Sequence, residues 1–158
     1  MMKIIADSSA NISALEGVCF QSIPMTIRAG EREFVDDGTL DTAKMLDYLA
    51  SYNGKSGTAC PGLDAWLQAF SGVDEIFVVT ITGALSGTCA SAVAARDLYL
   101  QSHPEARIHF FDSLSTGPEM LLLIEKLADL IREGKSFDEI CKAGQDYLAS
   151  THLLFILR

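Results

Sequence analysis

The chain has 158 residues, enough for one domain with a sizeable core, and its 49% hydrophobic and 21% charged residues exclude a disordered protein. Its 21 acidic and 12 basic residues give a formal net charge of −9, which argues against nucleic acid or an anionic membrane surface as a partner. No signal peptide or membrane-spanning segment is evident, and the four cysteines form no Cys-x-x-Cys pair, so we expect a cytoplasmic protein without metal or other cofactor.

The first half of the chain predicts short strands, turns and two helices. Pro24 favours an extended or edge segment, because proline cannot donate within a central strand. Trp66 and Phe70 fall on one face of an amphipathic helix. In chain order we expect a strand over 3–7, a turn over 8–11, an extended segment over 18–27, a hairpin turn over 29–31 with a return over 33–35, a turn over 36–38, a helix capped by Asp41 or Thr42, a polar loop over 53–57, and a helix with Pro61 at its first position.

The second half predicts alternating strands and helices. The run over 76–81 is continuously apolar and β-branched, which is typical of a central strand buried on both faces. We then expect a helix from Ser86 or Gly87 to about Gln101, a strand over 107–112, a helix over 120–133 stopped by Gly134, a helix started by the Ser136–Glu139 capping box, and a last strand over 152–157. The pattern predicts a single α/β domain over 1–158, with a mostly parallel sheet and helices on both faces.

Hydroxyl side chains gather where the predicted strands end. The segments are 7–9, 82–88 and 112–116, and a similar segment, 56–59, precedes the Trp66 helix. Ligands of open α/β sheets bind beyond the carboxyl ends of the strands. These segments are therefore the candidate binding region.

Within this region the stretch Leu85-Ser86-Gly87-Thr88 has two interpretations. Ser86 can be a simple helix cap. Alternatively, the free amides at a helix start, a glycine that admits a ligand close to the backbone, and the hydroxyls of Ser86 and Thr88 can form an anion site.

The other hydroxyl segments are weaker candidates. The Thr58-Ala59-Cys60-Pro61 segment is typical of a structural turn, and Asp7 before Ser8 can be either a metal ligand or a helix cap, of which the cap is favoured. The chain has no nucleophile elbow and no Walker A motif, and its three histidines support no catalytic triad.

In this order the segments resemble the DegV family of bacterial fatty-acid-binding proteins. The resemblance rests on Asp7-Ser8-Ser9 after the first strand, Thr58-Ala59-Cys60-Pro61, Leu85-Ser86-Gly87-Thr88 with Ser91-Ala92, Phe111-Asp112-Ser113, and Glu133-Gly134-Lys135-Ser136. It covers nearly the whole chain, and Leu-Ser-Gly-Thr is its most specific motif.

The resemblance implies a binding protein that is not itself an enzyme. Its ligand would be a long-chain fatty acid, with the carboxylate at Thr58 and Ser86. A separate fatty acid kinase would then convert the presented carboxylate to an acyl phosphate. Ser8, Gly87 and Thr88 complete the set of ligand-binding residues that we expect from the motifs.

The resemblance also implies a second domain of similar size, so we expect this chain to be either a fragment or a single-domain relative. We therefore expect the last strand to expose apolar surface that self-association or a partner would cover. Two other functions stay open: a small enzyme that binds a phosphorylated metabolite at the Ser86 helix start, and an interaction domain without a ligand.

Overall fold

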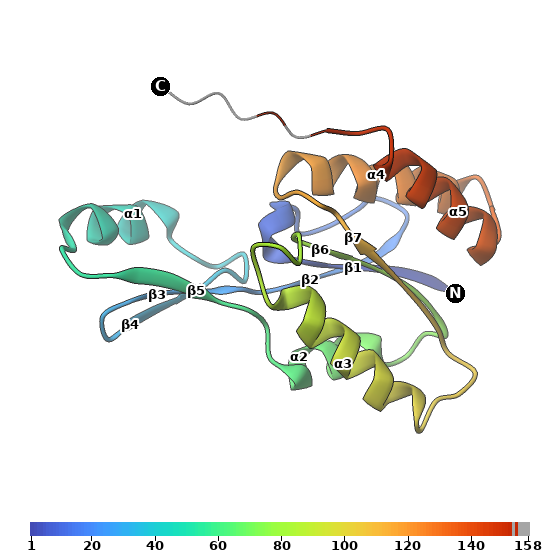
Figure 1. The fold of residues 1–158 in the computed structure, drawn as a ribbon, viewed down its shortest axis with the longest axis horizontal. Helices are drawn as coiled ribbons and strands as arrows, with labels where there is room; N and C mark the ends of the chain where they lie inside the picture. Colours follow the sequence, from blue (N-terminus) through green and yellow to red (C-terminus); the bar gives the residue numbers. More distant parts are fainter. Residues whose placement is uncertain (153, 155–158) are drawn as a thin grey trace.

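The computed structural model describes residues 1–152 and 154, which form two unequal parts (Figure 1). The elements, in chain order, are β1 (Met2–Asp7), a 3-10 helix (Ser8–Ala10), β2 (Cys19–Ile23), β3 (Thr26–Ala29), β4 (Arg32–Val35), α1 (Thr42–Ser51), β5 (Ser56–Ala59), α2 (Leu63–Phe70), β6 (Glu75–Thr80), α3 (Thr88–Leu100), β7 (Arg107–Asp112), α4 (Pro118–Arg132) and α5 (Phe137–Leu148). Among these helices none is both long and apolar enough to span a membrane.

A four-stranded sheet forms the larger part, which we call the body. Its order is β2-β1-β6-β7 and every pair is parallel, as the run over 76–81 predicted. The chain winds outward from β1 to β2 on one side and from β6 to β7 on the other. The topological switch point therefore lies between the carboxyl ends of β1 and β6, where ligands of such sheets bind.

Helices cover both faces of this sheet, which confirms the predicted fold class. On one face α4 and α5 bury Phe77, Phe111 and Leu127 in one apolar cluster. On the other face α2 and α3 bury Trp66 and Val78 in a second cluster. The central strands are buried on both sides because β-branched and aromatic residues occupy both faces of the pleat.

The smaller part, which we call the arm, is a three-stranded antiparallel sheet with α1 across it. Its order is β4-β3-β5, and Figure 1 shows it extending from the body at the carboxyl edge of the parallel sheet. The hairpin around Gly30 was predicted, but β5 was not. Residues 56 and 57 were expected in a polar loop; they are strand because they pair with Arg28 and Ala29.

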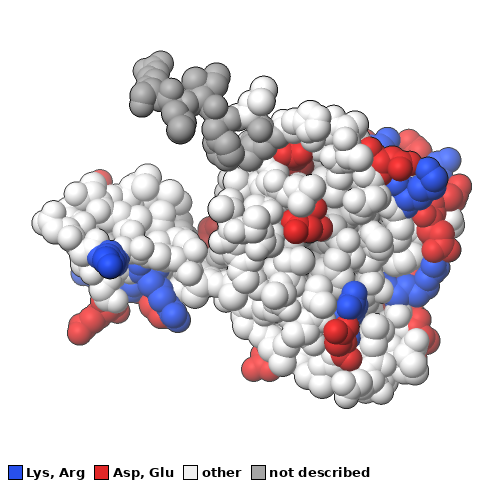
Figure 2. All heavy atoms as spheres, viewed as in Figure 1, with Lys and Arg blue, Asp and Glu red and all other residues white. Residues whose placement is uncertain are grey.

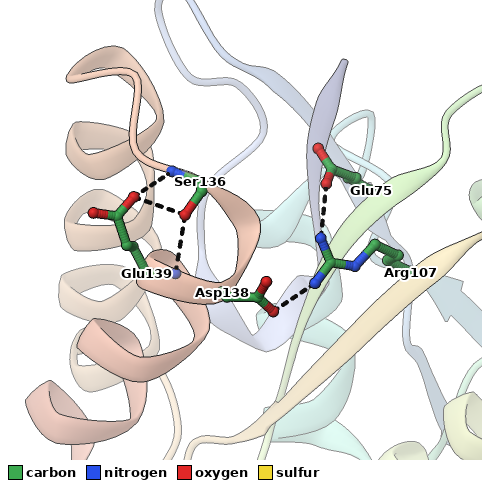
Figure 3. A network of polar contacts seen from close by, with 5 residues as sticks. All are labelled: Glu75, Arg107, Ser136, Asp138 and Glu139. Carbon is green, nitrogen blue, oxygen red and sulfur yellow. Dashed lines mark hydrogen bonds and ion pairs between the residues drawn. The ribbon is translucent and has the colours of Figure 1, made fainter.

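Figure 3 shows the polar contacts at the start of α5, some within the helix cap and some with the sheet. The capping box is confirmed: Ser136 Oγ accepts from the amide of Glu139 at 3.4 Å, and Glu139 Oε2 accepts from the amide of Ser136 at 2.9 Å. Arg107 of β7 bridges Glu75 and Asp138, with N–O distances of 3.3 and 2.5 Å. Its guanidinium also lies 4.2 Å from the ring centre of Phe137. The Arg107 contacts fix the start of α5 at the amino end of the sheet.

The structure bears on three predicted element ends. Pro61 is not the first residue of α2, because Gly62 is the N-cap and the helix starts at Leu63. At α3 the N-cap is Gly87, so Ser86 precedes the cap position rather than occupying it. The predicted last strand over 152–157 lies mostly outside the described residues; of the two that are described, neither His152 nor Leu154 is in a strand. Self-association through this segment stays a prediction.

Candidate functional site

The carboxylate of Asp7 lies at the switch point and accepts hydrogen bonds from the segments after β1 and β6. Its Oδ2 accepts from the amide of Ile81 at 2.7 Å, and its Oδ1 accepts from the amide of Ser9 at 3.1 Å and from the Ser9 hydroxyl. Burial raises the pKa of this carboxyl. Asp7 is thus the cap of the 3-10 helix, as favoured, and the described residues contain no cluster of His, Cys, Asp and Glu suited to a metal ion.

The hydroxyls after β7 also serve the backbone. The amide of Thr82 donates to the carbonyl of Ser115 at 2.9 Å, and the hydroxyl of the fully buried Ser113 donates to the same carbonyl at 2.9 Å. The Asp112 carboxylate accepts from the amides of Gly83 and Leu114. The hydroxyls of Ser113 and Ser115 and the Asp112 carboxylate therefore shape the loop that leads to Ser86.

The start of α3 is built as the sequence suggested, with one difference. Ser86 Oγ accepts from the amide of Thr88 at 3.2 Å, and the two hydroxyl oxygens lie 2.8 Å apart. Gly87 is the N-cap and has no side chain with which to cap the next amides. The amides of Cys89 and Ala90 consequently have no acceptor among the described residues. Ser86 is half-buried and Thr88 fully buried, so the pair is held in place.

A second helix starts beside the first. The hydroxyl of Ser91 in α3 donates to the carbonyl of Pro61 at 2.9 Å, and the rings of Phe70 and Tyr99 at the other ends of the helices lie 5.7 Å apart. The helices α2 and α3 therefore run side by side in the same direction, with their starts together (Figure 1). The N-cap of α2 is also a glycine without a side-chain cap. Two positive helix ends thus meet at the carboxyl edge of the sheet.

The arm contributes the Thr58 segment to this place. A Cβ added at Gly87 would lie 3.6 Å from the sulfur of Cys60, so the segment after β5 touches the start of α3. Thr58 pairs with Ile27 in the arm sheet and is exposed. We call residues 58–62 and 86–90 together the cradle. As defined, it includes four of the five predicted residues, Thr58, Ser86, Gly87 and Thr88, and the contact that joins its two segments is that of Cys60 with Gly87.

The fifth predicted residue, Ser8, lies elsewhere. Its hydroxyl accepts from the amide of Met25 at 3.0 Å, and it lines a separate pocket between β2 and the arm. The lining of that pocket includes no residue of the cradle. The motif Asp-Ser-Ser after the first strand does not show whether Ser8 lies at the cradle or at this separate pocket.

Two features of the edge were not predicted from the sequence. The uncapped start of α2 was missed because Pro61 was assigned to the first helical position; Gly62 was the available signal. The side chains of Leu85 and Leu114 are 74% and 75% exposed, and Leu114 has a left-handed backbone with φ 54°. Both side chains therefore add exposed apolar surface to loops at the carboxyl ends of the strands.

The cradle itself offers neutral donors. In Figure 2 the broad face of the body carries few charged side chains, and most of its basic ones gather at the end away from the arm. Hydroxyls and free amides at helix starts can hold one negative charge without a lysine or arginine. The arrangement suits a carboxylate or a phosphate.

The sequence and the fold both resemble those of known proteins. The profile of the DegV family, described as uncharacterised proteins, matches residues 1–158. A DegV domain-containing protein of Streptococcus pneumoniae is 45% identical over 98% of this chain, which spans 57% of that relative.

Solved structures match as well. A DegV family protein from Eubacterium eligens loaded with heptadecanoic acid has a TM-score of 0.92 and 50% identity, over 94% of this chain and 54% of that one. The fatty acid kinase B3 protein of Streptococcus pneumoniae, loaded with linoleic acid, has a TM-score of 0.89 and 43% identity over the same shares. The chain spans about half the length of these relatives, and it belongs to the DegV family.

Proposed function

We propose that this chain binds a long-chain fatty acid by its carboxylate at the cradle. The observation that carries the proposal is the meeting of Ser86 and the start of α3 with the Thr58 segment and the start of α2. A carboxylate here would accept from hydroxyls and from amides that lack other acceptors, in the field of two helix starts. The fatty acids in the Eubacterium eligens and Streptococcus pneumoniae relatives support this ligand class.

The exposed apolar surface beside the cradle fits the other end of such a ligand. Leu85 directly precedes Ser86, and Leu114 belongs to the loop after β7, in which the Ser115 carbonyl accepts from the amide of Thr82. Both exposed leucines would contact methylene groups or the part of a longer protein that encloses them. Because relatives are nearly twice as long, we expect a second half to complete the enclosure. Each buried methylene contributes about 0.8 kcal/mol, so affinity should grow with chain length.

We further propose that the bound carboxylate is presented to a separate fatty acid kinase for acyl phosphate formation in the cytoplasm. The chain would then act as an accessory binding protein and not as a catalyst. The name of the Streptococcus pneumoniae relative, a fatty acid kinase B3 protein, supports a kinase partner. The cradle supports presentation, since Thr58 and Gly87 are exposed and Ser86 is half-buried.

The test is a binding titration with oleate on the purified chain and three variants. We expect Ser86→Ala to weaken binding by roughly tenfold, because a hydrogen bond to a charged group is worth about 1.5–3 kcal/mol. Thr58→Val, which keeps the side-chain shape, should weaken it less. Ser71→Ala removes a hydroxyl at the opposite end of α2 and should change nothing. Equal affinities for all four proteins would refute the cradle as the carboxylate site.

Inorganic phosphate is the competitor that separates the alternatives. A helix start accepts phosphate for the same physical reason as carboxylate. Tight phosphate binding that Ser86→Ala abolishes, without oleate binding, would favour the phosphorylated-metabolite function. A protein that binds neither anion would favour the interaction domain.

A further inference from the structure

A pocket of about 510 Å³ lies at the junction of the body and the arm, apart from the cradle. Three segments form its walls: residues 8–13 after β1, residues 20–24 of β2 and its end, and residues 36–38 after β4. This volume falls within the usual range for small-molecule sites, about 300–1,000 Å³. Nothing in the proposed fatty-acid function uses it.

The walls of the pocket are tied to one another by backbone contacts. The amide of Met25 donates to Ser8 Oγ at 3.0 Å, and the carbonyl of Met25 accepts from the amide of Asp36 at 2.9 Å. Asn11 has a left-handed backbone with φ 55° and donates to the carbonyl of Ser8 at 3.0 Å. Met25 thus joins the wall after β1 to the wall after β4. The pocket is therefore formed before any ligand arrives.

The lining combines acceptors with apolar surface. The carboxylate of Asp36 has no partner among the described residues, and Asp37 uses only Oδ1, which accepts from the amide and hydroxyl of Thr39. Ser8 is only 6% exposed, and its oxygen can accept a second bond. No lysine, arginine or histidine lines the pocket, while Phe20 and Ile12 supply apolar walls.

These groups define the charge of a fitting ligand. Two carboxylates without a basic neighbour repel an anion and attract a cation, and the net charge of −9 adds to this field. An alkyl stem could lie along Phe20 and Ile12 while its charged end reaches Asp36, as the side chains of lysine and arginine do at apolar surfaces. The ring of Phe20 would also favour a nearby cation.

We propose that this pocket binds an alkyl ammonium or alkyl guanidinium group. Such a group has two sources, a lysine or arginine side chain of a protein partner and a free polyamine. The site is independent of the fatty-acid proposal, because its residues and its ligand charge both differ from those of the cradle.

Calorimetric titration of the chain with spermidine, and separately with a short apolar peptide that contains one arginine, tests this site. We expect saturable binding of at least one probe, and a loss of roughly tenfold in affinity on Asp36→Asn, because charge-assisted hydrogen bonds are lost. Asp47→Asn, on the exposed surface of α1, makes the same charge change outside the pocket and should leave affinity unchanged.

The probes also identify the source. Binding of the peptide alone assigns the pocket to a protein partner, and binding of spermidine alone assigns it to a free polyamine. If Asp36→Asn fails to fold, Asp37→Asn provides the second variant and should also weaken binding, because it removes the other carboxylate of the lining. The proposal is wrong if neither probe saturates at millimolar concentration, or if the Asp36 and Asp47 variants weaken binding equally.

Discussion

The body and the arm are both sheets with helices against them, but they differ in what the helices bury. In the body, β1 and β6 are buried along almost their whole length between helices on two faces. In the arm, α1 has no buried residue, and Ala29 is the buried residue of its strands. Burial is the main source of folding free energy, so the body should hold most of the stability. The cradle nevertheless takes Thr58 from the arm and Ser86 from the body.

The comparison predicts its largest difference for a pair of aromatic substitutions. Phe77→Ala removes a fully buried ring that stacks on Phe137 at 4.8 Å, and should lower the free energy of unfolding by about 3–5 kcal/mol. Phe34→Ala removes a half-buried ring of the arm that lies 5.6 Å from Tyr48, and should cost about 1 kcal/mol or less. Urea unfolding measures both. Similar costs would show that the arm is as well packed as the body.

Two glycine substitutions provide the next test. A Cβ at Gly144 in α5 would lie 2.7 Å from the ring of Phe111 and 2.9 Å from Leu127, so Gly144→Ala should destabilise the body by about 1–3 kcal/mol through overpacking. A Cβ at Gly57 in the arm would meet nothing within 4 Å. Gly57→Ala should therefore change the free energy of unfolding by less than about 0.5 kcal/mol. Thermal melts of the two variants make the comparison, and a stable Gly144→Ala protein would contradict close packing at α5.

The helix caps test whether the two parts unfold together. Ser136→Ala removes the cap of α5 and should lower the free energy of global unfolding by about 1 kcal/mol. Asp41→Ala removes the matching cap of α1, whose Oδ1 accepts from the amide of Lys44 at 3.1 Å. Hydrogen exchange should show faster exchange confined to α1 in this second variant. A uniform change across the body would mean that arm and body form one cooperative unit.

The smallest expected effect is a pH dependence that belongs to the body alone. His109 in β7 has a buried Nε2 without a partner among the described residues, and burial lowers its pKa. The unfolded chain therefore binds a proton more readily, and stability present above about pH 6.5 is lost as the pH falls toward the folded pKa of His109. His109→Gln should flatten the melting temperature between neutral and mildly acidic pH. The arm, residues 24–60, contains no histidine, so an unchanged slope would locate the effect in other groups.

The sequence predicted the local features of both parts, and failed where a partner strand decided the outcome. The capping box at Ser136 and the strand over 107–112 were found because each depends on neighbouring residues. Residues 56 and 57 were expected in a loop because the segment 53–57 is polar; they are strand because they pair with β3. The prediction that residues 33–35 pair back after the turn over 29–31 was correct, because the turn lies directly between the two strands.

In the candidate site, too, features that depend on neighbouring residues were predicted, and those that depend on distant segments were not. The Ser86-Gly87-Thr88 segment was identified from residue types, and its hydroxyls and amides meet as a helix start requires. The separation of Ser8 from the cradle was not predictable, because both segments follow strands and only the topology sets which edge positions adjoin. The contact of Cys60 with Gly87 joins residues 27 positions apart and likewise had no local signal.

By itself, the sequence determined the α/β class, the parallel body and the hydroxyl-rich strand ends, because periodicity, caps and turns act over a few residues. The tertiary structure alone decided that α2 and α3 start side by side, that the arm brings Thr58 to this place, and that a separate acidic pocket lies behind Ser8. These arrangements depend on contacts between distant segments, whose energies come from burial and pairing in the folded chain.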